Sequence, residues 1–372
     1  MLLSLSLVAA GFVLLTLGGD WLVGSSSALA ARAGISRLVV GLTVVAFGTS
    51  APELAVSISG AAAGKPDIAF GNVLGSNLFN TLAILGLSAA IAPLAISRRL
   101  FAFDLPVMIA ASLALWGIAA DGRVGRLEGL LLALGLAVYL AFQIRLSRGD
   151  PPPDPGEPPA PVRSLPRSLG MIVFSLAILV VGSQLLVRGA SDLARAFGLS
   201  ELIIGLTIVA VGTSLPEVAA SVAATLRGHR DIAVGNIVGS NIFNIGSVLG
   251  LSAAVAPSGI AVAREALALD IPIMVGSAIL CLPVFFTGRR VSRLEGWLFL
   301  ASYGAYVAFL ILDAQDHAAL PVYRFLLTRV FLPLSGLAIL ASLLIAWRSG
   351  NAVTRAVSSP TPGGTTGAPP PA

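Results

Sequence analysis

The sequence is poor in the residues on which soluble enzymes and metal-binding domains depend. Only 11% of its 372 residues are charged, and Lys65 is its single lysine. One cysteine, Cys281, lies inside an apolar run and cannot build a disulfide framework or a cysteine-based metal site. Two histidines far apart in the sequence, His229 and His317, argue against haem, zinc or a serine–histidine hydrolase. So few charges cannot cover the surface of a soluble protein of this size.

Apolar residues are abundant instead. They make up 56% of the chain, and the mean hydropathy is +0.93. Apolar runs of about 18 or more residues recur from end to end, which is the length needed to cross a bilayer. The net charge of +5 comes from arginines scattered between these runs, so we expect no nucleic-acid partner. The composition predicts an all-α polytopic membrane protein whose surroundings are the lipid bilayer.

The chain contains an internal repeat. Residues 41–86 and 205–250 align without a gap, and more than half of the aligned positions are identical. Each half contains five apolar runs, roughly 2–24, 37–63, 67–93, 102–120 and 127–146, then 169–188, 201–226, 231–257, 267–287 and 294–312. Because five is odd, the second copy must be inverted in the membrane, as in many secondary transporters. An eleventh run, 325–347, has no partner in the repeat.

These runs predict the domain organisation. We expect a first repeat of five spans over 1–148, a Pro-rich cytoplasmic linker over 149–168, a second, inverted repeat over 169–313, an extra helix over 324–348 and a disordered tail over 349–372. Most arginines fall in the connections that share a side with the linker and the tail. The positive-inside rule therefore predicts an external N-terminus, with the linker and the C-terminus in the cytoplasm.

Two acidic residues occupy equivalent mid-span positions, Glu53 and Glu217. A charge at mid-bilayer costs roughly 2.5–3.5 kcal/mol on insertion scales, so a symmetric pair favours a functional site. The alternative for each is a protonated carboxyl in an interhelical hydrogen bond. Each acid follows a GTSxP motif, and its proline, Pro52 or Pro216, should break the helix and free a backbone carbonyl four residues earlier. Such carbonyls at membrane depth must be buried in protein or line a cavity.

The span after each break carries the motif GNxxGSNxFN. Its polar side chains recur every four residues and form one stripe on an apolar helix, Asn72, Ser76 and Asn80 in one copy and Asn236, Ser240 and Asn244 in the other. The asparagines and serines bind an ion or, alternatively, link helices by hydrogen bonds. Together with the two glutamates and the hydroxyls of Thr49 and Thr213, they are hard oxygen donors of the kind that Ca²⁺ prefers. Two carboxylates balance one divalent ion, and Na⁺ or protons would compete for the same oxygens.

At these motifs the sequence resembles the calcium/cation antiporter superfamily, in particular the prokaryotic sodium/calcium exchangers. The resemblance covers 1 to about 312 and implies ten helices in two inverted halves that exchange Na⁺ for Ca²⁺ by alternating access. It implies that Ca²⁺ and Na⁺ are substrates, with no cofactor and no enzymatic activity. The family positions are matched by two acids, seven other side chains and two backbone carbonyls, namely Glu53, Glu217, Thr49, Ser50, Ser76, Asn80, Thr213, Ser214, Ser240, Ala46 and Ala210.

Asn244 departs from the pattern, because many members of the family carry aspartate there. We keep Asn244 as a ligand, but the site then holds two carboxylates, which leaves Na⁺, H⁺ or K⁺ open as counter-ion. The linker is also too short for the folded Ca²⁺-sensing domains of animal exchangers. Two other classes remain as alternatives. One is a cation channel, since channel filters also use acidic side chains. The other is an intramembrane enzyme, although no span carries a histidine or lysine that could act as a base.

Overall fold

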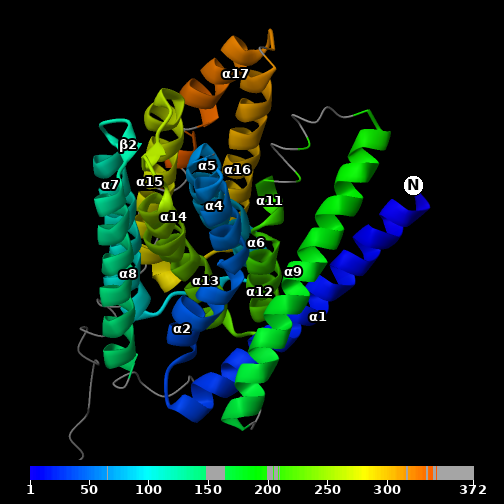
Figure 1. The fold of residues 1–372 in the computed structure, drawn as a ribbon, viewed down its shortest axis with the longest axis vertical. Coiled ribbons are helices and arrows are strands. Elements are labelled where there is room, and N and C mark those ends of the chain that lie inside the picture. The colour runs from blue at the N-terminus through cyan, green and yellow to red at the C-terminus, as the bar shows by residue number, and fades with distance from the viewer. Residues whose placement is uncertain are drawn as a thin grey trace, which may run out of the picture.

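Helices make up nearly all of the described chain in the computed structural model (Figure 1). The structure describes residues 1–64, 66–147, 164–198, 204, 208, 210–315, 317–331, 334–337 and 341. Within them, eight helices are long and apolar enough to cross a membrane, and one bent pair makes a ninth span. This confirms the all-α polytopic class. The predicted spans over 201–226 and 325–347 lie partly outside the described residues, as do most of the predicted linker and all of the tail after 348.

The first repeat begins with one long helix and then alternates regular helix with short π-helical turns. Its elements are α1 (Leu2–Ala33), α2 (Arg37–Val40), η1 (Gly41–Val45), α3 (Ala46–Thr49), α4 (Ala51–Ala62), α5 (Pro66–Leu78), η2 (Phe79–Ile84), α6 (Leu85–Ile91), β1 (Leu94–Ala95), η3 (Leu100–Asp104), α7 (Leu105–Ala119), β2 (Arg123–Val124) and α8 (Arg126–Ser147).

The described part of the second repeat follows a similar order. Its elements are α9 (Leu165–Ala196), α11 (Ala210–Gly212), α12 (Leu215–Leu226), α13 (Arg230–Phe243), η5 (Asn244–Leu249), α14 (Gly250–Val255), β3 (Ile260–Ala261), η6 (Ala266–Asp270), α15 (Ile271–Phe286), η7 (Thr287–Arg289), β4 (Arg290–Val291) and α16 (Arg293–Ala314). After the repeat come α17 (Leu320–Leu326) and η8 (Leu327–Phe331). Helix α9 begins inside the segment predicted as linker. Pro166 does not prevent this, because it stands in the first turn of the helix, where proline is tolerated.

The first helices of the two repeats, α1 and α9, lie side by side and run in opposite directions (Figure 1). Glycines bring them to backbone contact. A Cβ atom on Gly11 would lie 2.7 Å from the carbonyl oxygen of Gly182, and one on Gly189 would lie 2.6 Å from that of Ser4. Small residues allow this approach in a membrane, where packing drives helix association. The antiparallel pair is the relation expected between inverted repeats.

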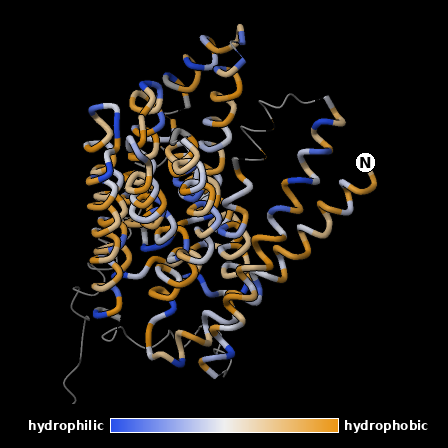
Figure 2. The backbone as a smooth tube through the Cα atoms, in the orientation of Figure 1, coloured by the Kyte–Doolittle hydropathy of each residue, from blue (hydrophilic) through white to orange (hydrophobic). Residues whose placement is uncertain are grey.

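The centre of the molecule is formed by α5 and α13 with the π-helical turns that follow them. In the most apolar 18-residue stretch of the span Arg230–Val255, 100% of the residues are buried. In the corresponding stretch of Arg293–Ala314, 11% are buried. Hydrophobic residues also line the outer helices, which is expected of lipid-facing surfaces (Figure 2). Two antiparallel bridges join the repeats at their loops, β1 with β4 and β2 with β3. The sequence did not predict them.

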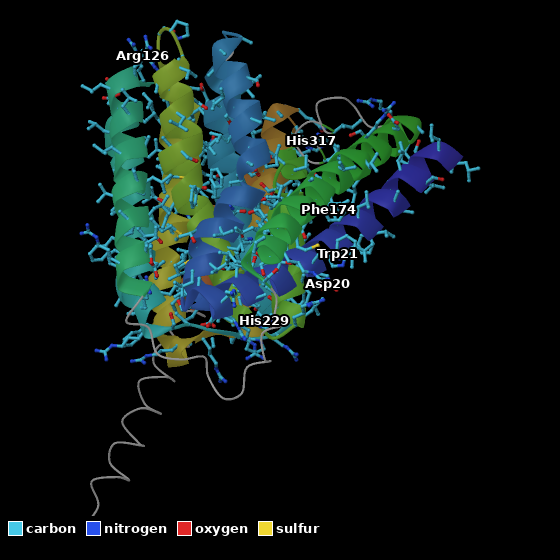
Figure 3. All side chains as sticks on the ribbon, turned by 60° about the horizontal axis from the view of Figure 1, so that its bottom comes forward. Asp20, Trp21, Arg126, Phe174, His229 and His317 are labelled. Carbon is cyan, nitrogen blue, oxygen red and sulfur yellow. The ribbon has the colours of Figure 1, made fainter. Side chains whose placement is uncertain are left out.

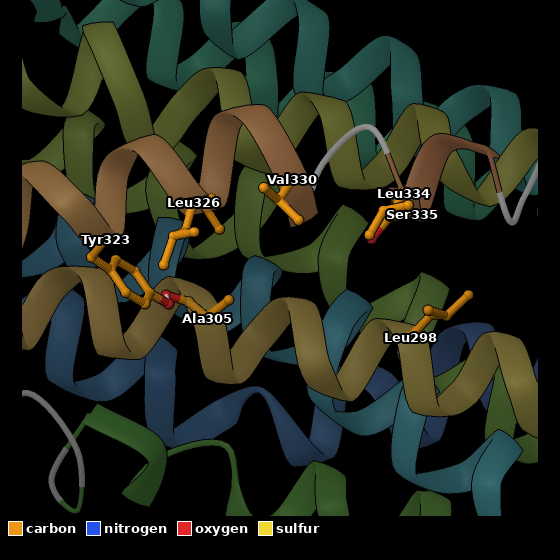
Figure 4. A pocket seen from close by; sticks show the side chains of 8 residues that line it. Leu298, Ala305, Tyr323, Leu326, Val330, Leu334 and Ser335 are labelled. Atoms are coloured by element: carbon orange, nitrogen blue, oxygen red, sulfur yellow. Dashed lines mark hydrogen bonds between the residues drawn. The ribbon is translucent and has the colours of Figure 1, made fainter.

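The cavity between α16 and the α17–η8 segment is apolar (Figure 4). Its volume is about 490 Å³, and leucine, valine, alanine, tyrosine and serine side chains line it, among them Leu298, Leu326 and Val330. It contains no carboxylate and lies away from Glu53 and Glu217, so it is not a candidate ion site.

Charged side chains connect α1 to the loop between α12 and α13. Arg227 donates from Nε to Oδ1 of Asp20 at 2.7 Å, and its guanidinium passes over Gly24 one turn further along α1. His229 lies near Asp20 (Figure 3). Nη1 of the buried Arg37 lies 3.3 Å from Nδ1 of His229. Burial of His229, together with the positive charges of Arg37 and Arg227, lowers its pKa to about 4.

This depressed pKa predicts a pH-dependent stability. The imidazole of an unfolded chain has a pKa of about 6.5, so the unfolded state binds more protons as the pH falls from about 6.5 to 4. Stability from the neutral His229 is present above that window and is lost on acidification through it, by on the order of 3 kcal/mol. Thermal unfolding in detergent should show this loss in the wild type and much less of it in His229→Gln. Equal acid sensitivity of the two proteins would contradict the assignment.

Candidate functional site

Both predicted helix breaks are present, and each falls on the serine of the GTSxP motif. Ser50 has φ −82° and ψ 5° and lies between helical residues, and Ser214 has φ −88° and ψ 6° and follows a turn at Thr213. The segments Arg37–Thr49 and Ala51–Ala62 meet at 44°. Pro52 and Pro216 stand in the first turn of α4 and α12, where their missing N–H groups cost nothing. Each break brings the acid that follows it to the start of a new helix.

The two acids are buried, and each is held by the other repeat. Glu53 and Glu217 are both 1% exposed. The hydroxyl of Ser214 donates to Oε1 of Glu53 at 3.0 Å, and the hydroxyl of Ser50 donates to Oε1 of Glu217 at 3.0 Å. The oxygen of Ser214 also lies 3.2 Å from the hydroxyl oxygen of Ser76. The serine at each break therefore serves the carboxylate of the opposite half.

Asn72 and Asn236 support this arrangement from α5 and α13. The amide nitrogen of Asn72 donates to the backbone oxygen of Glu53 at 3.3 Å, and its oxygen accepts from Thr213 at 3.4 Å. Asn236 repeats the pattern, with its nitrogen 3.4 Å from the backbone oxygen of Glu217 and its oxygen 3.1 Å from Thr49 Oγ1. For these two asparagines the structure supports the helix-linking alternative.

Five buried oxygens on predicted site residues have no protein partner in the described part of the chain. They are Oε2 of Glu53, Oε2 of Glu217, Oδ1 of Asn244, Oδ1 of Asn80 and Oγ of Ser240. Asn80 and Asn244 fall in the π-helical segments η2 and η5, a distortion that is frequent at functional sites. An unpaired buried acceptor costs about 1–3 kcal/mol. Five of them on the predicted site residues suit a cation that enters from solution.

The remaining predicted residues occupy less direct positions. The carbonyl of Ala46 accepts from Thr49 Oγ1 at 3.4 Å and from the backbone nitrogen of Ser50 at 3.0 Å, while Ala210 begins α11. The carbonyl of Gly212, which Pro216 frees from the helix, accepts a hydrogen bond from Ser183 of α9. The long antiparallel helices thus contact the second break directly.

Sequence reasoning missed one pair of supporting residues. Ser57 and Ser221 accept the second amide hydrogen of Asn72 and Asn236, at 2.9 and 3.0 Å. Each serine lies one helical turn after its glutamate and at the same place in the repeat. Both repeats carry a serine at the same position, on the helix face that also carries the glutamate. This identity was the signal that could have identified the two residues.

The donor set determines the chemistry that is available. No group of three or more His, Cys, Asp or Glu side chains in the described residues could hold a metal ion. The arrangement combines two carboxylates with neutral hydroxyl, amide and carbonyl oxygens. Such a set suits hard cations such as Na⁺ and Ca²⁺ and does not suit soft transition metals.

Comparison with known proteins identifies close relatives. The family model described as sodium/calcium exchanger protein matches residues 3–145 and 167–312. The chain is 31% identical over 339 residues to the sodium/calcium exchanger MaX1 of Methanosarcina acetivorans, covering 81% of this chain and 96% of that protein. It is 37% identical over 275 residues to the inner membrane protein YrbG of Escherichia coli, covering 70% and 82%.

A solved structure also matches most of the chain. The sodium-calcium exchanger NCX_Mj, studied in crystals soaked with Na⁺ and Ca²⁺, superposes with a TM-score of 0.72 at 30% sequence identity. The match covers 83% of this chain and 98% of that one.

Proposed function

We propose a transport function from one premise: the chain belongs to the sodium/calcium exchanger protein family. It is a multi-pass membrane antiporter of cations and not an enzyme. Beyond this, we propose that it exchanges Ca²⁺ for Na⁺ across the membrane by alternating access. Glu53 and Glu217 would bind the cations between the two inverted repeats.

One observation carries the proposal: each glutamate is held by the break serine of the opposite repeat. Ser214 donates to Glu53 and Ser50 donates to Glu217, so both halves of the chain contribute to one site. A site between inverted repeats is open to either side of the membrane when one repeat rocks or slides against the other. This geometry favours a carrier over a channel, because a channel needs a continuous path rather than a site that faces two directions in turn.

The charge of the site determines which counter-ions can be exchanged for Ca²⁺. Two carboxylates neutralise one Ca²⁺, and with Ca²⁺ absent their mutual repulsion favours the entry of Na⁺ or protons. Hydroxyl, amide and carbonyl oxygens supply the neutral ligands that Na⁺ needs. Asn244 in place of an acid favours a second candidate, Ca²⁺/H⁺ exchange, because fewer fixed negative charges remain to attract several Na⁺ ions. K⁺ is a third possible counter-ion.

We further propose that the protein resides in a bacterial plasma membrane with its N-terminus outside. The arginine-rich connections, among them those at Arg98 and Arg227, would then lie in the cytoplasm together with the C-terminus. In this orientation the Asp20–Arg227 ion pair lies in the cytoplasmic half of α1.

Uptake of ⁴⁵Ca²⁺ into proteoliposomes tests the function. Vesicles are loaded with Na⁺, K⁺ or acid and diluted into medium that lacks the loaded ion or, for acid, has a higher pH, which creates the outward gradient. We expect uptake under the outward Na⁺ gradient that saturates with Ca²⁺ concentration. Uptake driven by the pH gradient alone would establish the second candidate, and uptake that needs no counter-ion would favour a channel. Absence of uptake under every gradient would mean that Ca²⁺ is not the substrate.

A further inference from the structure

Asn244 is held in one orientation by a residue outside the predicted site. Its amide nitrogen donates to Oδ1 of Asn77 at 3.1 Å, and both side chains are buried. With the nitrogen directed at Asn77, the oxygen of Asn244 points the other way. That oxygen is one of the buried oxygens without a partner in the described chain.

The orientation of Asn77 is itself determined. Its amide nitrogen donates to the backbone oxygen of Asn241 at 3.4 Å and lies 3.7 Å from the sulfur of Met274. A carbonyl and a thioether can accept a hydrogen bond but have no hydrogen to donate. A reversed amide would place the oxygen of Asn77 against both acceptors, so Oδ1 stays directed at Asn244.

The equivalent residues of the other repeat are arranged differently. Asn241, the mate of Asn77, donates to Thr81 Oγ1 at 3.0 Å and lies 3.4 Å from the sulfur of Met108. Its own oxygen has no partner in the described residues, and neither does the amide nitrogen of Asn80, the mate of Asn244. Asn241 therefore packs in a similar environment without orienting a candidate ligand.

We propose that Asn77 is a positioning residue that turns the oxygen of Asn244 toward the transported ion and makes position 244 a neutral ligand. The proposal rests on the proposed function. A carboxylate at 244 would face Asn77 oxygen to oxygen, so the surroundings of this position accept an amide and disfavour an acid. The site thereby keeps two negative charges, which ties its choice of cations to Glu53 and Glu217.

The test compares Asn77→Leu with its matched control Asn241→Leu in the same ⁴⁵Ca²⁺ uptake assay. We expect Asn77→Leu to raise the apparent KM for Ca²⁺ about 10-fold or more, the usual effect of losing a group that orients a metal ligand. The maximal rate should stay close to that of Asn241→Leu, whose KM should remain near the wild-type value. Similar increases in the KM of both variants would show a packing effect and overturn the proposal.

A double-mutant cycle separates positioning from packing. In the background of Asn244→Ala, the change Asn77→Leu should raise KM no further, because nothing remains to be oriented. An increase that persists in this background would overturn the proposal.

If Asn77→Leu is not recovered folded, Asn244→Asp tests the same geometry by the sign of its effect. An added charge alone would lower the KM for Ca²⁺, whereas repulsion between the new carboxylate and Oδ1 of Asn77 should raise it. A lowered KM would overturn the proposal. Failure of the wild type to transport Ca²⁺ at all would instead refute the proposed function.

Discussion

Glu53→Gln and Glu217→Gln should each lower the apparent affinity for Ca²⁺ on the order of 100-fold or more, a loss large enough to remove uptake at low Ca²⁺. At a ligand distance of about 2.4 Å, the attraction between a carboxylate and Ca²⁺ is about 3.5 kcal/mol even with the full screening of water. This energy corresponds to about 300-fold in affinity, and the buried site screens the attraction less than water does. Glutamine keeps the shape and one oxygen, so the change isolates the charge.

Both variants should behave alike, because each glutamate receives the same cross-repeat hydrogen bond. Glu265→Gln is the matched control, since Glu265 is exposed and lies at the start of η6, away from the site. Saturation curves for ⁴⁵Ca²⁺ uptake measure the effect, with equal amounts of reconstituted protein. Wild-type KM in Glu53→Gln would refute the assigned site and leave the fold unaffected. A large loss in one glutamate variant alone would mean that the two carboxylates are not equivalent.

The helix breaks illustrate what the sequence could predict. Proline four residues after a glycine has a local steric effect, and the breaks at Ser50 and Ser214 follow from it. The internal repeat predicted the inverted architecture in the same way, because an odd number of spans permits no other topology. These inferences need only neighbouring residues or a count of apolar runs.

The partners of the site residues could not be predicted in this way. Ser50 donates its hydrogen bond to Glu217 and not to Glu53, which is close to it in the sequence. This choice depends on how two distant segments cross, and no local sequence pattern encodes that crossing. The same holds for Asn77, whose motif looks identical to that of Asn241 and whose role differs through one hydrogen bond. Ser183 is a further case, because the freed carbonyl was predictable and the donor from α9 was not.

Gly239→Leu should disrupt the site by displacing helix α13, although residue 239 itself is not a proposed ion ligand. Helix α13 crosses the α2–η1 segment at backbone contact. A Cβ atom on Gly239 would lie 2.7 Å from the carbonyl oxygen of Leu42 and 2.8 Å from the Cβ of Ala46. A leucine must therefore push α13 away from the segment that carries Thr49, whose hydroxyl reaches Asn236 across the same contact. We expect a loss of stability of about 1–3 kcal/mol or more, with loss of Ca²⁺ uptake.

Thermal unfolding and ⁴⁵Ca²⁺ uptake of the same preparation measure both effects. Gly135→Leu is the matched control, because Gly135 is an exposed glycine within α8 and a Cβ there would meet no described atom within 4 Å. Both variants gain the same helix propensity, so a difference between them reports the close contact alone. Wild-type stability and uptake in Gly239→Leu would mean that α13 can move away from η1 without cost. The Thr49–Asn236 bond would then contribute nothing to the placement of Glu217, since that bond spans the contact that the leucine forces apart.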